Sequence, residues 1–163
     1  MKRILLAILF CASQAAAESH TLSSHKAWDV AFQNFTNRDA CSMTSQNNAG
    51  HILDFTIWDD GEMQMFAFFN TEYDLWYDEV YDAKFNIGKT DWTLPDADWN
   101  QSHMAFTFQR DDAAAFFEDV IQGNSITLID PEGADVTAWS LAGSQNAFVA
   151  LVACFKRLEG APA

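Results

Sequence analysis

Apolar and polar residues alternate along most of the chain, the pattern of strands that bury one face. In residues 26–35, Trp28, Val30 and Phe32 fall on one face and Asp29 on the other. Comparable runs predict further strands at 40–46, 51–58, 62–69, 83–88, 91–94, 103–108, 124–129 and 135–141. The Asp-Gly pair at the end of "WDDG" indicates a hairpin between two of them.

Residues 71–85, TEYDLWYDEVYDAKF, continue this alternation with an unusual density of rings and acids. As a strand, the segment places its tyrosines and Phe85 on one face, which is expected to be buried. The opposite face carries Trp76 with Asp74 and Asp78. Two interpretations stay open for it: an ordinary solvated face, or a groove that binds a basic peptide or a sugar. A third alternative is that the segment is a loop and not a strand.

In two segments the spacing of the apolar residues changes from that of a strand to that of a helix. Residues 111–123 place five apolar side chains on one helical face, and Gly123 can end that helix. These are Ala113, Phe116, Phe117, Val120 and Ile121. A second helix, 145–158, carries a stripe of Phe148, Leu151, Val152 and Phe155. We therefore predict a mainly β (α+β) fold: an antiparallel sheet or sandwich with one inserted helix and one C-terminal helix.

The first seventeen residues have the layout of a secretory signal peptide. Lys2 and Arg3 precede a short apolar run, and Ala15 and Ala17 occupy the −3 and −1 positions before Glu18. Cleavage after Ala17 predicts a periplasmic or secreted protein. The expected organisation is a signal peptide (1–17), a flexible tail (18–25), one β-rich domain (26–158) and a C-terminal tail (159–163).

The acidic composition limits the classes of partner. The chain has nine Lys and Arg against 23 Asp and Glu, a net charge of −14. Loss of Lys2 and Arg3 with the signal peptide leaves seven basic residues and a net charge of −16. Nucleic acid and anionic membrane surfaces are therefore poor partners. No stretch after the signal peptide predicts a membrane span.

Two cysteines remain after the predicted cleavage, Cys41 and Cys154. In an oxidising compartment a disulfide between them is the default expectation, and two buried free thiols are the alternative.

The acidic residues suggest little metal chemistry. Residues 96–100 open like a calcium-binding EF-hand loop, but Gln101 replaces the required glycine and Thr107 the closing glutamate. Weak Ca²⁺ binding by Asp59, Asp60 and Glu62, or by Asp96 and Asp98, stays open. The histidines show no zinc spacing, so we expect no metal site and no cofactor. Residues 95–102 are expected to form a loop.

A Ser-Leu-Ala-Gly-Ser element, residues 140–144, precedes the last helix. Gly143 permits a sharp turn and the Ser144 hydroxyl can cap the helix. With the helix that ends at Gly123 and the strand pair between them, residues 113–157 resemble the C-terminal part of invasion-associated locus B-type proteins, small periplasmic proteins of alphaproteobacteria. The chain differs from that family in having no cysteine but Cys154 in this half, and Ser144 where phenylalanine is usual.

The resemblance implies an envelope location and a β-rich fold, and it brings no catalytic residues. The sequence thus predicts a non-catalytic binding or interaction protein of the cell envelope, whose partner is an envelope protein, a basic peptide or a glycan. The alternative is a small glycan hydrolase that uses paired carboxylates. A third hypothesis is a structural or inhibitor-type partner of another envelope protein.

Overall fold

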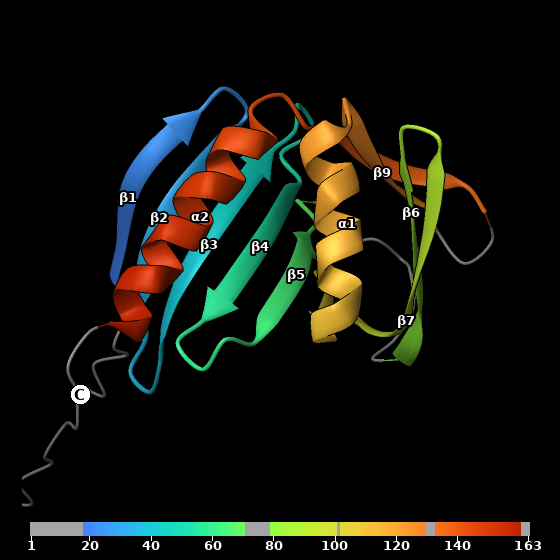
Figure 1. Ribbon diagram of the computed structural model, residues 1–163. Coiled ribbons are helices and arrows are strands. Elements are labelled where there is room, and N and C mark those ends of the chain that lie inside the picture. Colours follow the sequence, from blue (N-terminus) through green and yellow to red (C-terminus); the bar gives the residue numbers. More distant parts are fainter. Residues whose placement is uncertain (1–17, 71–78, 101, 130–132, 161–163) are drawn as a thin grey trace, which may run out of the picture.

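The computed structural model describes residues 18–70, 79–100, 102–129 and 133–160 (Figure 1). Within these residues ten antiparallel strands form one sheet in the order β1-β2-β3-β4-β5-β8-β7-β6-β9-β10. The elements are β1 (Glu18–His25), β2 (Trp28–Asn34), β3 (Asp39–Gln46), β4 (Ile52–Trp58), β5 (Met63–Phe68), β6 (Glu79–Ile87), β7 (Thr90–Trp99), β8 (His103–Phe108), α1 (Arg110–Gln122), β9 (Ser125–Ile129), β10 (Asp135–Ser140) and α2 (Ser144–Glu159). The predicted fold class, a mainly β sheet with an inserted and a terminal helix, is confirmed.

Both helices lie on the same face of the sheet, α2 across β1 to β4 and α1 beside it (Figure 1). The core fills the space between that face and the helices. Trp28, Met43, Phe55 and Met65 contribute to it from four neighbouring strands, and each is at most 1% exposed. The alternation expected in β6 is also confirmed, since Ala83 and Phe85 are fully buried while Val80 is exposed.

The sheet curves so that β10, its last strand, lies close to the start of β2 and to the residue before β4. The Trp28 indole Nε1 donates a hydrogen bond to the Ser140 carbonyl oxygen (3.1 Å), and the Trp139 Nε1 donates to the carbonyl oxygen of His51 (2.9 Å). The two buried rings thus satisfy their polar atoms while joining strands that are far apart in sequence.

Residues 18–25 were expected to be a flexible tail, and here the structure differs. They form β1, which pairs with β2 from Glu18 opposite Asn34 to His25 opposite Trp28. Almost all side chains of β1 are exposed, so the strand lacks the apolar alternation from which strands are recognised. Its backbone pairing, rather than its side chains, holds it at the edge of the sheet.

The prediction of a loop at residues 95–102 is also wrong for residues 95–99, because β7 continues to Trp99. Ala83 pairs with Leu94 and Tyr81 with Ala97, so Pro95 and Asp96 interrupt the register together. Asp96 has a positive φ of 56°. A bulge of this kind accommodates a proline that cannot donate a ladder hydrogen bond, and the pairing resumes beyond it.

Candidate functional site

The residues that the sequence singled out have different outcomes. Asp74, Trp76 and Asp78 lie outside the described residues, so their proposed groove stays a prediction. The disulfide is confirmed: Cys41 of β3 is bonded to Cys154 of α2, with their Cα atoms 6.0 Å apart.

The turn before α2 is confirmed at Gly143 and corrected at Ser144. Gly143 has a φ of 94°, and a Cβ atom there would lie 2.1 Å from the carbonyl oxygen of His25. Gly143 itself is the N-cap residue, and no side chain caps the helix. The Ser144 hydroxyl instead donates to the carbonyl oxygen of Val120 (2.9 Å). It is buried, and it needs a partner that α1 supplies. The serine therefore joins the two helices rather than capping one.

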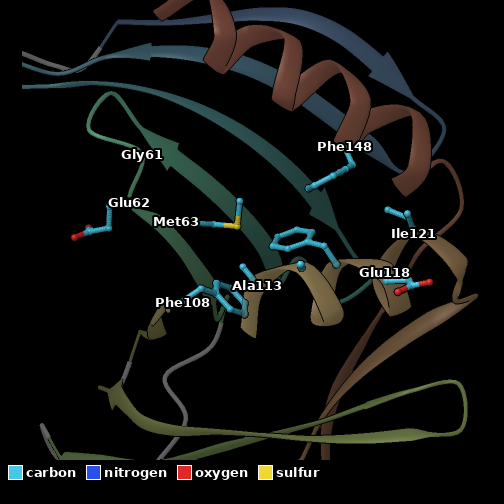
Figure 2. A pocket seen from close by; sticks show the side chains of 10 residues that line it. Gly61, Glu62, Met63, Phe108, Ala113, Glu118, Ile121 and Phe148 are labelled. Atoms are coloured by element: carbon cyan, nitrogen blue, oxygen red, sulfur yellow. The ribbon is translucent and has the colours of Figure 1, made fainter. Parts of the chain in front are cut away.

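A cleft opens between these helices, and we call it the interhelical cleft (Figure 2). It has a volume of about 450 Å³. Its lining comes from α1, α2, the end of β8, the turn between β4 and β5, and the first residue of β5. The lining residues are Gly61, Glu62, Met63, Phe108, Ala113, Ala114, Phe117, Glu118, Ile121 and Phe148. Eight of these ten have no charged group, so the cleft can take an apolar ligand group.

Helix α1 forms one wall of the interhelical cleft because its apolar arc is wider than the core can cover. Phe116 and Val120 are fully buried, whereas Ala113 and Ile121 are half-buried at the edge of the arc. Phe116 lies 5.1–6.3 Å, centroid to centroid, from rings of β4, β6, β7 and β8. These ring contacts orient the helix so that the residues beside Phe116 face the cleft.

Helix α2 forms the other wall in an orientation that its sequence did not predict. Its buried line is Ser144, Ala147, Leu151 and Cys154, which shares Leu151 with the expected stripe but replaces its other, larger members. Small side chains and the disulfide bring this line against the sheet. Phe148 is thereby placed on the flank of the helix, where it stacks on Phe117 at 4.9 Å and lines the cleft.

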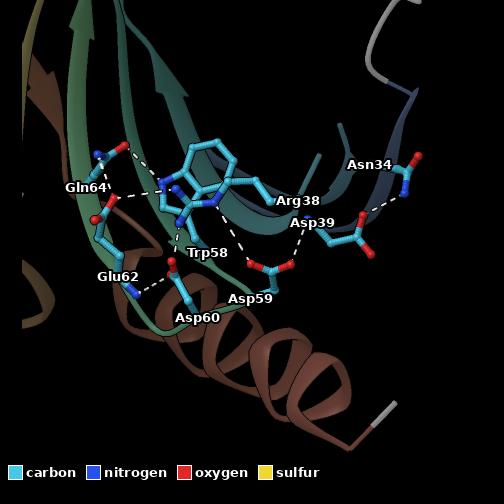
Figure 3. Close-up of polar contacts among 8 residues, drawn as sticks. All are labelled: Asn34, Arg38, Asp39, Trp58, Asp59, Asp60, Glu62 and Gln64. Carbon is cyan, nitrogen blue, oxygen red and sulfur yellow. Dashed lines mark hydrogen bonds and ion pairs between the residues drawn. The ribbon is translucent and has the colours of Figure 1, made fainter. Parts of the chain in front are cut away.

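At its mouth the cleft meets the acidic β4–β5 turn, of whose carboxylates only that of Glu62 belongs to the cleft lining. Asp59, Asp60 and Glu62, which we call the acidic hairpin, surround one guanidinium, that of Arg38 (Figure 3). The Arg38 nitrogens lie 3.9, 2.9 and 3.8 Å from the respective carboxylate oxygens. The guanidinium carbon also lies 4.0 Å from the centre of the Trp58 ring. This network fixes the turn, and with it Gly61 and Glu62 in the cleft lining.

The two carboxylates of the cleft are not arranged as a catalytic pair. Glu62 accepts a hydrogen bond from Gln64 Nε2 (2.9 Å), and Glu118 accepts one from Gln122 (3.2 Å). Figure 2 shows them at opposite sides of the opening, pointing away from each other. A glycosidase needs two carboxylates that face one substrate bond. The two carboxylates of the cleft lack this arrangement.

The described residues contain no group of three or more His, Cys, Asp or Glu side chains placed to hold a metal ion. The acidic hairpin is engaged with Arg38, and Asp96 lies in the bulge of β7. Weak Ca²⁺ binding at either place stays a prediction. Among the described residues, no helix is both long and apolar enough to cross a membrane.

One buried carboxyl group lies outside the cleft. Asp54, in the middle of β4, is 4% exposed, and burial raises its pKa from 3.8 to about 7. The Thr56 hydroxyl donates a hydrogen bond to it (2.5 Å), which opposes this rise in pKa. Neighbours along a strand point to opposite faces, so Asp54 faces away from the helix-covered side that holds Leu53 and Phe55.

The sequence did not reveal the interhelical cleft. It predicted Ala113, Phe117, Ile121 and Phe148 as core stripes, and it raised Glu62 as a calcium ligand or as one of a pair of carboxylates with Asp59. The one available signal was the run of alanines at the start of the first helix, Ala113 to Ala115, which leaves room beside Phe117. The alanine run does not tell which other element of the fold forms the opposite wall of the cleft.

Comparison with solved structures gives a match to invasion associated protein B from Bartonella henselae. The TM-score is 0.55 at 14% sequence identity, over 87% of this chain and 99% of that one. The similarity shows a shared fold and confirms the resemblance seen in the sequence. No protein-family model matches the chain, and a search of curated proteins gives no match.

Proposed function

We propose that this protein is an exported, non-catalytic binding protein of the cell envelope, and that it holds an apolar group of its ligand in the interhelical cleft. The observation that carries the proposal is the cleft itself, an apolar opening of about 450 Å³ between two helices. This volume lies within the range of roughly 300–1,000 Å³ that is typical of ligand pockets.

Export is supported by three features. The first seventeen residues have a signal-peptide pattern, the fold contains one disulfide, and a protein of the same fold is named as invasion associated. Mass spectrometry of the protein from a cell that exports it should find a mature chain starting at Glu18. A mature chain that retains Lys2 and Arg3 would contradict export by this route.

The construction of the cleft supports binding. Its walls are supported from behind: α2 is bonded to β3 through Cys154, and α1 packs through Phe116 and Phe117. An opening that exists before the ligand arrives avoids much of the ordering cost of binding. Each large apolar side chain buried there contributes about 1.5–3 kcal/mol before such costs.

Two adjacent alanines provide a matched test. Both alanines are exposed on α1, but Ala114 lines the cleft and Ala115 does not. Nile red, a neutral apolar dye, should bind the native protein saturably with an increase in fluorescence. Ala114→Trp should fill the cleft and abolish this binding, and Ala115→Trp should leave it intact. Absence of saturable binding to the native protein, or equal loss in both variants, would overturn the proposal.

A further inference from the structure

We propose that the ligand of the interhelical cleft is a cationic amphipathic peptide segment of a partner protein, which places apolar side chains in the cleft and Lys or Arg against its acidic mouth. This inference rests on the proposed function, because it names the ligand class of the same site.

The shape of the site suits a peptide segment. Ser144 of α2 is hydrogen-bonded to Val120, in the last turns of α1, so the helices are joined at that end. Figure 1 shows them diverging from this end toward the β4–β5 turn, with β4 and β5 visible between them. Met63 and Phe108 line the cleft from the sheet side. An opening with a sheet floor and helical walls resembles the grooves that receive the apolar face of an amphipathic segment.

The charge of the mouth selects the sign of that segment. Glu62 contributes a carboxylate to the cleft lining from the β4–β5 turn, and it shares the single guanidinium of Arg38 with Asp59 and Asp60. Glu118 adds another carboxylate on the α1 side of the cleft and is exposed. The basic residues Lys156 and Arg157 belong to the last turn of α2 and do not line the cleft. Complementary charge raises association rates and rejects partners of the wrong sign.

The same features disfavour other ligands. A fatty acid or an anionic lipid would bring its negative head group against Glu62 and Glu118. A glycan presents many hydroxyl groups, which need polar partners along the whole site. Most of the lining is aliphatic or aromatic carbon. A peptide with apolar anchors and cationic flanks satisfies both parts of the site.

The test compares two synthetic peptides with the same Leu and Phe face, one carrying Lys and the other Glu at the polar positions. Fluorescence anisotropy should show the Lys peptide binding at least roughly tenfold more tightly than the Glu peptide. Its affinity should fall as salt rises, because the mouth is exposed. Unlabelled Lys peptide should displace Nile red from the same cleft.

Charge reversal locates the effect. Glu118→Lys should weaken the Lys peptide roughly fivefold, while Asp135→Lys, the same change at an exposed position on β10, should leave its affinity unchanged. Equal or tighter binding of the Glu peptide, or equal effects of both variants, would overturn the peptide assignment. If the native protein binds Nile red but does not prefer the Lys peptide to the Glu peptide, this inference alone is rejected. If it binds neither Nile red nor the Lys peptide, the proposed function is rejected as well. Because the peptide comparison uses the native protein, the result does not depend on how the variants fold.

Discussion

The two helices that wall the cleft are held to the sheet in different ways. Helix α2 is fixed by a covalent bond, Cys41–Cys154, and its N-cap residue Gly143 lies directly against the backbone of His25. Neither helix has a side-chain cap at its start, and α1 is held by the rings around Phe116. A cleft between them therefore combines a cross-linked wall with one that depends on noncovalent packing. The difference predicts that α1 adjusts more readily than α2 when a ligand enters.

Removal of the disulfide should produce the largest loss of stability. Replacement of Cys41 and Cys154 by Ala together frees a loop closed over a sequence separation of 113 residues. Loop entropy alone predicts a loss of up to about 4.7 kcal/mol in the free energy of unfolding. Urea denaturation of the double variant, compared with the disulfide-bonded native protein, measures it. A loss below 1 kcal/mol would show that α2 does not depend on its cross-link.

Truncation of Phe116 should be the corresponding change for α1. The side chain is fully buried among rings of four strands, so Phe116→Ala should cost about 3–5 kcal/mol. Phe148→Ala, a half-buried ring on the cleft flank, is the matched control and should cost less. Denaturant midpoints give both values. Equal costs would mean that the ring cluster does not anchor α1 specifically.

Gly143 tests the close approach of α2 to the sheet. Gly143 and Gly133 have nearly the same φ, 94° and 92°, but a Cβ at Gly133 would meet no atom within 4 Å. Gly133→Ala should cost about 1–2 kcal/mol through backbone strain alone. Gly143→Ala should cost more, on the order of 2–4 kcal/mol, because the added carbon also meets the His25 carbonyl. Thermal unfolding compares the two, and equal costs would remove the packing explanation.

Asp54 lies in β4 on the face of the sheet away from both helices, so its effect on stability should not depend on how either helix is held. Because burial raises its pKa to about 7, the native state binds more protons than the unfolded state between pH 4 and pH 7. The free energy of unfolding should therefore fall as pH rises through this window, by up to about 1.4 kcal/mol per unit from this group. Asp54→Asn, which keeps an acceptor for Thr56, should flatten that slope. Identical pH profiles for native protein and variant would contradict it.

The sequence predicted the parts of the fold that depend on repeating side-chain patterns. The strand that carries Trp28 and Val30, the alternation of Ala83 and Phe85, and the apolar arc of α1 were all readable from local spacing. The disulfide followed from having two cysteines in an oxidising compartment. Two predictions of secondary structure were wrong, the flexible tail at residues 18–25 and the loop at residues 95–99. The first depends on the backbone pairing of β1, and the second on the bulge at Pro95.

The candidate site could not be predicted because it lies between elements. Phe148 and Ala113 look like core residues in their own helices. They become cleft residues only because Cys154 and Ser144 set the rotation and position of α2 beside α1. The cluster chosen from sequence, around Trp76, stays a separate prediction.

Methionine methyl groups permit the most direct test of the central claim, that the interhelical cleft is the binding site. Met63 lines the cleft, whereas Met43 is fully buried in β3. NMR of protein labelled at its methionine methyls should show the Met63 signal shifting saturably as the Lys peptide is added, with Met43 unmoved. Binding of the peptide with no change at Met63 would place the site elsewhere and contradict the account.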